Sequence, residues 1–502
     1  NLLIHITNGF LVYCLVLLLF KAAASGQAQG PAPTDHGRSV LRSHAPFIAL
    51  ATALLFIAHP LQTQAVTYIV QRFTSLAALF YLLAIVCYLK WRLSSLSTLN
   101  SQLLTSLWYA AALLSALLAM KTKENSFTLP LMLLMVEAIF FRPYVKKRWV
   151  TLMPFLAMLL IIPFSHVDAV GEAEAGFAQE TTEISRASYL LTQFRVIVTY
   201  IRLLLLPINQ NLDYDYPIYH SLFDSTVFFS FLLILSLLGL ASYLLFRSPR
   251  LTLNTQLKPI AFGVLWFFLT LSVESSIIPI RDVIFEHRVY LPSVGIFLTV
   301  STWVLGRPGR LPAWGMVSLV AVVLLLSIAT YQRNLIWKDD MTLWKDGVAK
   351  APHKARGHNN LGVAYKDRGR LEEAIGEYQT ALKLQPDFVE ARYNLGSAYS
   401  DQGHLEEAIR EYQTALQLKP DYARAHNNLG NAYRGQGRLE EAIREYQTAL
   451  RLQPNLAETH HSLGVAYRSR GMLEAARIEF EQALKIKPDL LPARQAIESL
   501  TP

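Results

Sequence analysis

The sequence is poor in cysteine and in charge, and these two shortages exclude several classes of protein. Only Cys14 and Cys87 occur among its 502 residues, both inside apolar runs, so neither a disulfide framework nor a cysteine-ligated zinc site is expected. No spacing of histidine and cysteine suits a metal, and neither a Walker loop nor a Ser-His-Asp pattern can be argued. We therefore expect no metal and no covalently bound cofactor.

Charged residues make up 17% of the chain and hydrophobic residues 52%, but these averages conceal two unlike parts. As far as about Tyr331 the chain is a series of apolar runs, whereas after Asp339 it is rich in Glu, Arg, Asn and Gln. This split indicates a membrane part followed by a soluble part. Much of the net charge of +9 lies in short loops between the apolar runs. In that place it indicates membrane topology, and no nucleic-acid partner is expected.

Ten apolar segments approach the roughly 20 residues that a helix needs to cross a bilayer. We expect spans at 2–20, 46–65, 73–90, 102–120, 126–141, 149–165, 226–246, 259–279, 289–305 and 313–331. The segment 187–206 is also apolar, but Arg195 and Arg202 lie two turns apart on one helical face. We expect this helix to lie in the membrane interface.

Charge in the loops predicts the orientation of these spans. One alternate set of loops carries fourteen basic residues and a single acidic residue, Asp35. The excess of Lys and Arg in cytoplasmic loops places this set inside. Ten crossings then begin and end outside, so the soluble part is expected on the outer face. An odd number of spans, most simply one, is expected upstream of Asn1.

A period of 34 residues runs through the soluble part and predicts tetratricopeptide (TPR) repeats. It is carried by Pro352, Pro386, Pro420, Pro454 and Pro488, by Gly362, Gly396, Gly430 and Gly464, and by Tyr365, Tyr399, Tyr433 and Tyr467. One helix pair cannot bury its apolar face alone, so stacked neighbours complete the core. We expect a capping helix at 337–354, four repeats at 355–388, 389–422, 423–456 and 457–490, and a C-terminal tail at 491–502.

An amide recurs just before the Leu-Gly pair of the first helix in each repeat except the last. The four positions are Asn360, Asn394, Asn428 and Ser462. In a TPR superhelix the first helices line the concave groove, so this ladder is predicted to bind the backbone of an extended peptide. It resembles the asparagine ladder of O-GlcNAc transferase. The alternative is that asparagine is simply a consensus surface residue.

Four strings in the membrane part carry a family resemblance. They are AHPLQTQAVTYIVQRFTSLAALFYLL (58–83), AMKTKENSFTLPLMLL (119–134), LLPINQNLDYDYP (205–217) and EHRVYLPSVG (286–295). With the trailing repeats, they make the chain similar to the transmembrane-and-TPR-containing O-mannosyltransferases and their bacterial relatives. The resemblance implies a GT-C glycosyltransferase fold, a polyprenyl-phosphate-linked sugar donor and a protein hydroxyl as acceptor. It also implies a catalytic carboxylate on the first outer loop, which would precede Asn1, so the catalytic residue of this chain is unknown.

Several charged residues near the outer membrane ends are candidates for binding the donor phosphate. Arginine suits phosphate because its planar fork pairs with two oxygens. The candidates are Arg288, Tyr290, His287, Glu286, Arg281, Lys123, Glu124 and Arg72. A structural pair between Glu286 and Arg288 is an equally open alternative. Lys121 is more simply explained as a lysine that extends to the membrane surface.

The sequence as a whole predicts an all-α protein, with a polytopic GT-C-like membrane domain at 1–336 followed by a TPR solenoid. Its predicted function is transfer of a sugar from a polyprenyl-phosphate carrier to a protein hydroxyl, with the TPR arm binding the acceptor or a partner. The alternative is a non-catalytic, membrane-anchored TPR scaffold. No Asn-x-Ser/Thr sequon occurs, which favours a bacterial inner membrane with a periplasmic arm over an endoplasmic-reticulum membrane with a lumenal arm.

Overall fold

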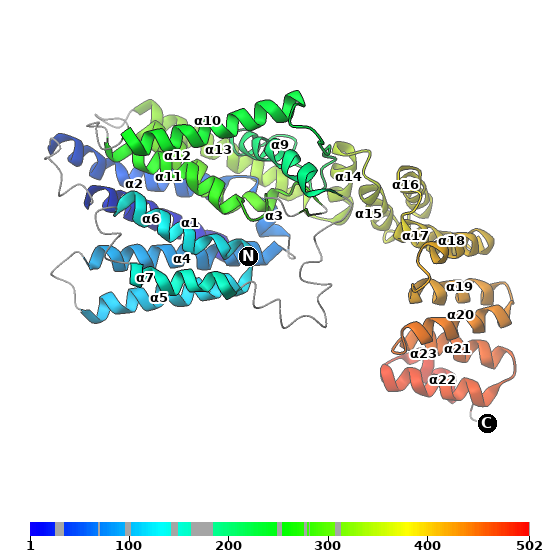
Figure 1. Cartoon of the computed structure of the whole chain (residues 1–502). Helices are drawn as coiled ribbons and strands as arrows, with labels where there is room; N and C mark the ends of the chain where they lie inside the picture. The colour runs from blue at the N-terminus through cyan, green and yellow to red at the C-terminus, as the bar shows by residue number, and fades with distance from the viewer. Residues whose placement is uncertain are drawn as a thin grey trace. The chain divides into compact units, whose positions relative to one another are not determined.

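The computed structural model describes residues 1–25, 35–68, 71–95, 102–141, 149–161, 184–247, 254–275, 279–280, 282–306 and 313–500. Helices account for all the regular structure in these ranges, and no β-strand occurs among them. The chain divides into two compact units, one made of residues 1–212 and 216–337 and the other of residues 213–215 and 338–502. We call the first the membrane domain and the second the repeat arm (Figure 1).

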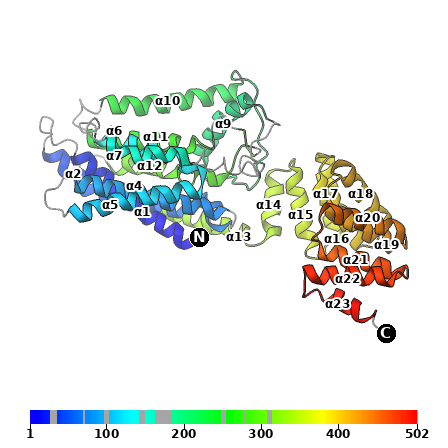
Figure 2. The same cartoon turned by 60° about the horizontal axis from the view of Figure 1, so that its bottom comes forward.

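Long apolar helices form the membrane domain. They are α1 (Leu2–Ser25), α2 (Asp35–Ala58), α4 (Arg72–Ser94), α5 (Gln102–Thr122), α9 (Arg186–Leu205), α10 (Ser225–Arg247), α11 (Asn254–Leu271), α12 (Ser293–Leu305) and α13 (Ala313–Ile336). Shorter elements are α3 (Gln62–Thr67), η2 (Glu124–Thr128), α6 (Leu129–Phe140), α7 (Trp149–Ala157), η4 (Met158–Leu160) and η6 (Glu286–Val289). α1 packs on α2 and α4, and α12 packs on α2 and α11, so these helices form one bundle (Figure 1 and Figure 2).

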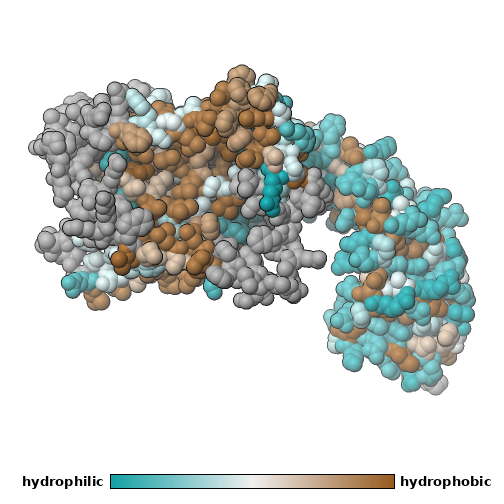
Figure 3. All heavy atoms as spheres, in the orientation of Figure 1, coloured by the Kyte–Doolittle hydropathy of each residue, from teal (hydrophilic) through white to brown (hydrophobic). Residues whose placement is uncertain are grey.

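Six helices in the described ranges are long and apolar enough to cross a membrane: α1, α4, α5, α9, α10 and α13. Four expected spans appear as shorter apolar stretches at 43–58, 150–160, 257–271 and 293–305. The expected span 126–141 differs in form, because its first part belongs to the 3₁₀ helix η2, which runs directly into α6, and α6 has only 12 residues. Such a helix is about 18 Å long and falls short of a bilayer core. The chain is a multi-pass membrane protein with an apolar outer surface on this domain (Figure 3).

Helix α9 differs from the interfacial helix that the sequence predicts. Its 20 residues meet the length and composition of a span, and more than half of its apolar window is buried. Gln193 is fully buried and donates to the carbonyl of Val283 at 3.0 Å. Tyr200 Oη donates to the carbonyl of Phe285 and accepts from its amide, both at 3.0 Å. Gln193 and Tyr200 of α9 therefore hold the segment before η6.

Two glycines allow α11 and α12 to touch. A Cβ on Gly263 would overlap the carbonyl oxygen of Gly295, and a Cβ on Gly295 would overlap the carbonyl oxygen of Gly263. Small residues at such a crossing let two membrane helices approach backbone to backbone. Because η6 directly precedes α12, this contact brings η6 close to the segment that follows α11.

The repeat arm is a series of helix pairs after a first single helix. They are α14 (Asp340–Lys350), α15 (Ala355–Lys366) with α16 (Leu371–Leu384), α17 (Val389–Asp401) with α18 (Leu405–Leu418), α19 (Ala423–Gly435) with α20 (Leu439–Leu452), and α21 (Ala457–Ser469) with α22 (Leu473–Ile486). A last helix, α23 (Leu491–Glu498), lies in the segment expected to be a tail. Its Ala496 packs against Ala476 and Phe480, so it covers the apolar end of the solenoid.

Residues at corresponding positions have the same structural role in each helix pair. Gly369, Gly403, Gly437 and Gly471 have φ between 72° and 82° in the turn between the two helices, a conformation that glycine adopts without strain. The rings of Tyr378, Tyr412, Tyr446 and Phe480 are fully buried against the glycine of the first helix. The period seen in the sequence is therefore a repeated packing unit.

Candidate functional site

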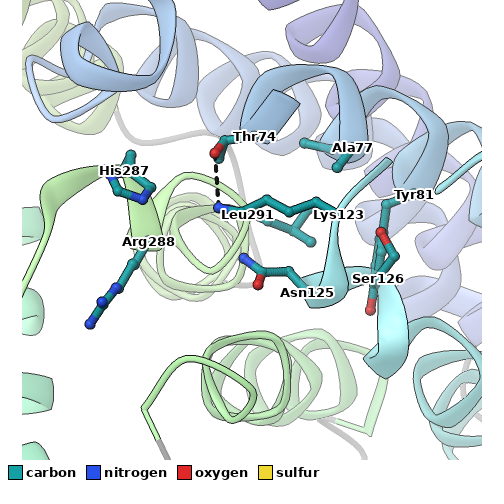
Figure 4. Close-up of a pocket in the computed structure, with 10 residues that line it drawn as sticks. Thr74, Ala77, Tyr81, Lys123, Asn125, Ser126, His287, Arg288 and Leu291 are labelled. Carbon is teal, nitrogen blue, oxygen red and sulfur yellow. Dashed lines mark hydrogen bonds between the residues drawn. The ribbon is translucent and has the colours of Figure 1, made fainter. Parts of the chain in front are cut away.

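A small pocket at one end of the bundle gathers three of the predicted donor-binding residues. α4 contributes Thr74, Ala77, Ala78 and Tyr81, the segment from α5 to η2 contributes Lys123, Asn125 and Ser126, and the start of the η6–α12 segment contributes His287, Arg288 and Leu291 (Figure 4). The contact between α11 and α12 and the bonds from α9 hold the third group in place. Three segments distant in sequence thus converge on one cluster of polar side chains.

Lys123 is the cation best placed to face a ligand. It lies in the extended link between α5 and η2, and its Nζ donates to Thr74 Oγ1 at 3.0 Å (Figure 4). The same Nζ lies 3.1 Å from Glu274 Oε1, and the two side chains are 17% and 13% exposed. The lysine is therefore neutralised by a carboxylate inside the protein, although both groups keep some access to solvent.

The guanidinium of Arg288 holds its own loop. Its Nη1 donates to the carbonyl of Val283 at 3.2 Å, and its Nη2 donates to the carbonyl of Asp282 at 2.9 Å. The side chain is 4% exposed and extends away from Lys123 (Figure 4). Arg288 supplies positive potential to the pocket, while its fork is occupied by backbone oxygens.

The charges in the cluster favour an ionised Glu274 and a neutral His287 ring. Burial would raise the pKa of Glu274, but Lys123 and Arg288 outweigh it and lower the pKa to about 2. Burial lowers the pKa of His287, and Lys123 lowers it further, to about 3. Glu274 is therefore ionised and His287 neutral at physiological pH. With Lys123 and Arg288 charged, the four groups carry one net positive charge.

The pocket is narrow, and one of its lining side chains, His287, has a ring nitrogen without a hydrogen-bond partner in the described ranges. Its open volume is about 10 Å³, which is room for about one water molecule. Within the described ranges, the buried Nδ1 of His287 has no hydrogen-bond partner. A larger anion requires Lys123 to move away from Thr74, which its long flexible side chain permits.

The buried side chains of Glu286 and Tyr290 make their hydrogen bonds outside the pocket. Glu286 Oε1 accepts a hydrogen bond from the backbone N–H of Asn211 at 2.8 Å, and its Oε2 lies 3.9 Å from Arg333 Nη2. The hydroxyl of Tyr290 is bonded to His5 Nδ1 at 2.8 Å and accepts from Asn8 Nδ2 at 3.1 Å. Glu286 thus fixes a loop and α13, and Tyr290 ties α12 to α1. No direct pair between Glu286 and Arg288 is needed to explain either residue.

The remaining candidates do not line the pocket. Glu124 and Arg72 are exposed, and the guanidinium of Arg72 lies 5.2 Å from the centre of the neighbouring Phe73 ring. Arg281 lies outside the described residues. Conversely, Thr74, Asn125 and Glu274 belong to the cluster and were not predicted. The Lys-Glu-Asn string at 123–125 contains a signal for Asn125, whereas nothing local marks Thr74 or Glu274.

The amide ladder of the arm is half-buried and partly engaged between repeats. Asn394 Nδ2 donates to Asn359 Oδ1 at 2.9 Å, and Asn428 Nδ2 donates to Tyr393 Oη at 3.0 Å. Asn360 Oδ1 accepts from Asn359 Nδ2 at 3.1 Å. Ser462, the fourth position, is also half-buried. These amides connect neighbouring first helices, so part of their hydrogen-bonding capacity is used within the arm.

The described part of the chain contains no group of three or more His, Cys, Asp or Glu side chains that could hold a metal ion. Two of the three polar groups facing Lys123 are a hydroxyl and an amide, and the third is a single carboxylate. Because Lys123 and Arg288 both line it, the pocket suits an anion better than a cation.

Comparisons with known proteins match both parts of the chain. A TPR repeat family matches residues 362–403, 396–437 and 430–468, and a tetratricopeptide repeat family matches 457–490. Protein O-mannosyl-transferase Tmtc3 of Drosophila melanogaster is 27% identical over 443 residues, which are 78% of this chain and 46% of that protein. Protein O-mannosyl-transferase TMTC1 of Homo sapiens is 28% identical over 390 residues, covering 68% of this chain and 43% of that protein.

The chain spans about half the length of these curated relatives, or less. Among solved structures, that of MamA is 28% identical and covers 30% of this chain and 86% of that one, with a TM-score of 0.28. TTC0263 of Thermus thermophilus, a TPR protein, is 23% identical and covers 36% of this chain and 94% of that one, with a TM-score of 0.29. The arm consists of TPR repeats, and the chain is similar over most of its length to protein O-mannosyl-transferases.

Proposed function

We propose that this chain, whose curated relatives are protein O-mannosyl-transferases, is an integral-membrane GT-C glycosyltransferase that moves a sugar from a polyprenyl-phosphate carrier to a protein hydroxyl. The observation that carries the proposal is the joint match: one alignment to such a relative covers 78% of the chain, and TPR families match its C-terminal part. The relatives' names make mannose the first sugar to test. A fold alone would not support an activity.

The pocket around Lys123 supplies the chemistry that the donor needs. A lipid-linked phosphate brings negative charge to the edge of the bilayer, and an ammonium group binds phosphate oxygens as a point charge. In our proposal a phosphate oxygen replaces the carboxylate of Glu274 beside Lys123, His287 Nδ1 gains a hydrogen-bond partner, and Arg288 adds positive potential from behind. Thr74 and Asn125 orient the lysine side chain.

The arm is proposed to hold the acceptor protein or a partner. TPR repeats are protein-interaction modules, and the row of Asn360, Asn394, Asn428 and Ser462 lies on their first helices. The excess of basic residues in alternate loops supports an arm outside the cytoplasm, in the periplasm or the lumen of the endoplasmic reticulum. This is the side on which lipid-linked sugars would be consumed in the proposed reaction.

A non-catalytic scaffold is the second candidate, and one observation favours it. The pocket has room for about one water molecule, and Lys123 is already paired with Glu274 at 3.1 Å. A protein that had lost its donor substrate would need no more than this closed arrangement. The arm would then recruit partners to the membrane.

Donor binding separates these two functions. The chain is reconstituted in lipid nanodiscs and titrated with a polyprenyl-phosphate-linked mannose, with the corresponding neutral polyprenol as a reference. Lys123→Met should weaken binding of the phosphate by about tenfold or more, the equivalent of one hydrogen bond to a charged group. Lys121→Met is the matched control, because Lys121 lies two residues away at the end of α5 and is exposed.

Equal affinity of the wild type for the phosphate and the polyprenol would contradict the transferase and favour the scaffold. Unchanged affinity in the Lys123→Met protein would reject the assigned pocket. Thermal unfolding of all three proteins checks that the substitutions leave the fold intact.

A further inference from the structure

Three histidines occupy the same position in three of the four repeats. His358, His426 and His460 lie in the first helices α15, α19 and α21 and are separated by multiples of 34 residues. In each case Nδ1 lies 2.6 Å from a glutamate oxygen of the second helix, in the pairs His358–Glu377, His426–Glu445 and His460–Glu479. The other ring nitrogen, Nε2, lies 3.0–3.1 Å from the carbonyl oxygen of Pro352, Pro420 or Pro454.

Each histidine therefore connects three parts of the solenoid. The proline lies just after the preceding helix of the arm, the histidine lies on the first helix of a repeat, and the glutamate lies on the second helix of that repeat. We call this arrangement of proline carbonyl, histidine and glutamate a junction clamp. The histidine side chains are only 10–16% exposed, so water competes weakly for their hydrogen bonds.

The second repeat has arginine at the same position. Arg392 Nη1 donates to Glu411 Oε2 at 3.0 Å, and its Nη2 donates to the carbonyl of Pro386 at 2.9 Å. Glu411 and Pro386 occupy the same positions in their repeat as Glu445 and Pro420, which lie 34 residues further on. An obligate cation with donors on both sides thus makes the contacts that the three histidines make. The position calls for a cation that can donate to two acceptors.

A neutral imidazole cannot satisfy such a position. Its ring has one N–H and one lone pair, whereas the imidazolium has two N–H groups. A carboxylate and a backbone carbonyl both require a donor. Loss of the proton therefore breaks one of the two hydrogen bonds and sets a lone pair against the other acceptor.

We propose that the arm is a pH-responsive solenoid in which protonated His426 and His460 clamp two junctions closed. When these two rings lose a proton their junctions loosen, while the junction held by Arg392 stays closed. The arm then changes its local stability in the pH range in which histidine titrates. The junction of the second repeat does not respond to pH and serves as a fixed reference.

The surrounding charges agree with this assignment. Burial lowers the pKa of His426, but the Glu445 carboxylate and the carbonyl of Pro420 raise it more, and the net shift is upward. Arg451 of α20 opposes this rise. Glu479 raises the pKa of His460 against the effect of burial, and Lys485 of α22 lines the same hollow as His460.

The sign of the pH effect follows from these shifts. A histidine whose pKa is higher in the folded arm stabilises the fold fully below its unfolded value near 6.5. That stabilisation is lost as the pH rises through the folded value. The clamps of His426 and His460 are therefore closed below about pH 6.5 and open above their raised folded pKa. His461 does not take part, because burial lowers its pKa and its ring faces Phe480.

Hydrogen exchange of the full chain in nanodiscs tests the proposal at each junction separately. Protection factors, corrected for the pH dependence of intrinsic exchange, are measured by mass spectrometry between pH 6 and pH 8. Peptides covering 420–445 and 454–479 should lose protection by about tenfold, the equivalent of one hydrogen bond to a charged partner. The peptide covering 386–411 is the internal control and should not change.

Two variants complete the test. Arg392→His should give the 386–411 junction the same pH dependence, and His426→Arg should remove it from the 420–445 junction alone. Equal pH dependence at the Arg392 junction and the histidine junctions of the wild type would overturn the proposal. So would pH dependence that persists at the 420–445 junction after His426→Arg. The wild-type comparison stands even where a variant folds poorly.

Discussion

The buried ion pair between Arg92 of α4 and Glu137 of α6 gives a sharp test of what holds the membrane domain together. Glu137 Oε1 accepts from Arg92 Nε at 2.8 Å and from Tyr88 Oη at 2.9 Å, and both charged side chains are at most 1% exposed. The substitution Glu137→Ala removes the counter-charge while the guanidinium stays buried. We expect it to lower the free energy of unfolding by about 3–5 kcal/mol, the range for breaking a buried pair on one side.

Unfolding in detergent by guanidinium chloride, followed by tryptophan fluorescence, measures this loss. The double variant Arg92→Met, Glu137→Met should recover most of it, because apolar side chains of similar volume often replace a buried pair at little or no cost. Glu124→Ala is the control, since Glu124 is exposed and should change stability by at most about 0.5 kcal/mol. A Glu137→Ala protein as stable as that control, or a double variant less stable than the Glu137→Ala protein, would refute the reasoning.

Two further predictions concern the arm. Gly430→Ala should destabilise it by about 1–2 kcal/mol, since the new Cβ would lie 2.7 Å from Cε1 of the buried Tyr446 ring and overpacking outweighs the gain in helix propensity. Gly376→Ala, whose new Cβ would have nothing within 4 Å, should instead stabilise the arm by about 0.5–1 kcal/mol. Thermal unfolding followed by circular dichroism compares the two variants. Equal effects on stability would contradict the packing argument. Replacing Asn360, Asn394 and Asn428 together by Ala should reduce capture of extended peptides from a random library; unchanged capture with a lower melting temperature would mean that the amides serve only to join the repeats.

The arm was predictable because its packing is local and repeated. Gly430 meets Tyr446 only sixteen residues further on, and the same contact recurs in every repeat, with Phe480 in place of tyrosine in the fourth, so the 34-residue period records the contacts directly. The last helix escaped prediction for a related reason. Residues 491–498 lack the recurring residues of the period, and the contacts of Ala496 with Ala476 and Phe480 show that this segment covers an open end.

The pocket was predictable only in part because its contacts are distant in sequence. Lys123, His287 and Arg288 stood out as charges at the ends of apolar runs, which is a local signal. Glu274 reaches Lys123 across about 150 residues, and Thr74 does so across about fifty. The roles of Tyr290 and Glu286 depended on partners such as His5 and Asn211, which no spacing indicates.

The segment 126–141 illustrates what composition does not show. Its residues are apolar enough for a membrane helix, yet residues 124–128 form the 3₁₀ helix η2, which runs directly into α6 with Pro130 in its first turn. Proline is tolerated there because the N–H groups of a first turn have no partner within the helix. The extended backbone at Lys123 and the 3₁₀ turn at Asn125 allow both side chains to reach the pocket.

Sugar transfer in membranes tests the central proposal most directly. Membranes from cells that express the native gene are supplied with polyprenyl-phosphate-linked radiolabelled mannose and a peptide rich in serine and threonine. The account predicts label on peptide hydroxyls, unchanged by Lys121→Met and reduced by about tenfold or more by Lys123→Met. Label no higher than in membranes without the gene would contradict the transferase and leave the membrane-anchored scaffold as the function of this chain.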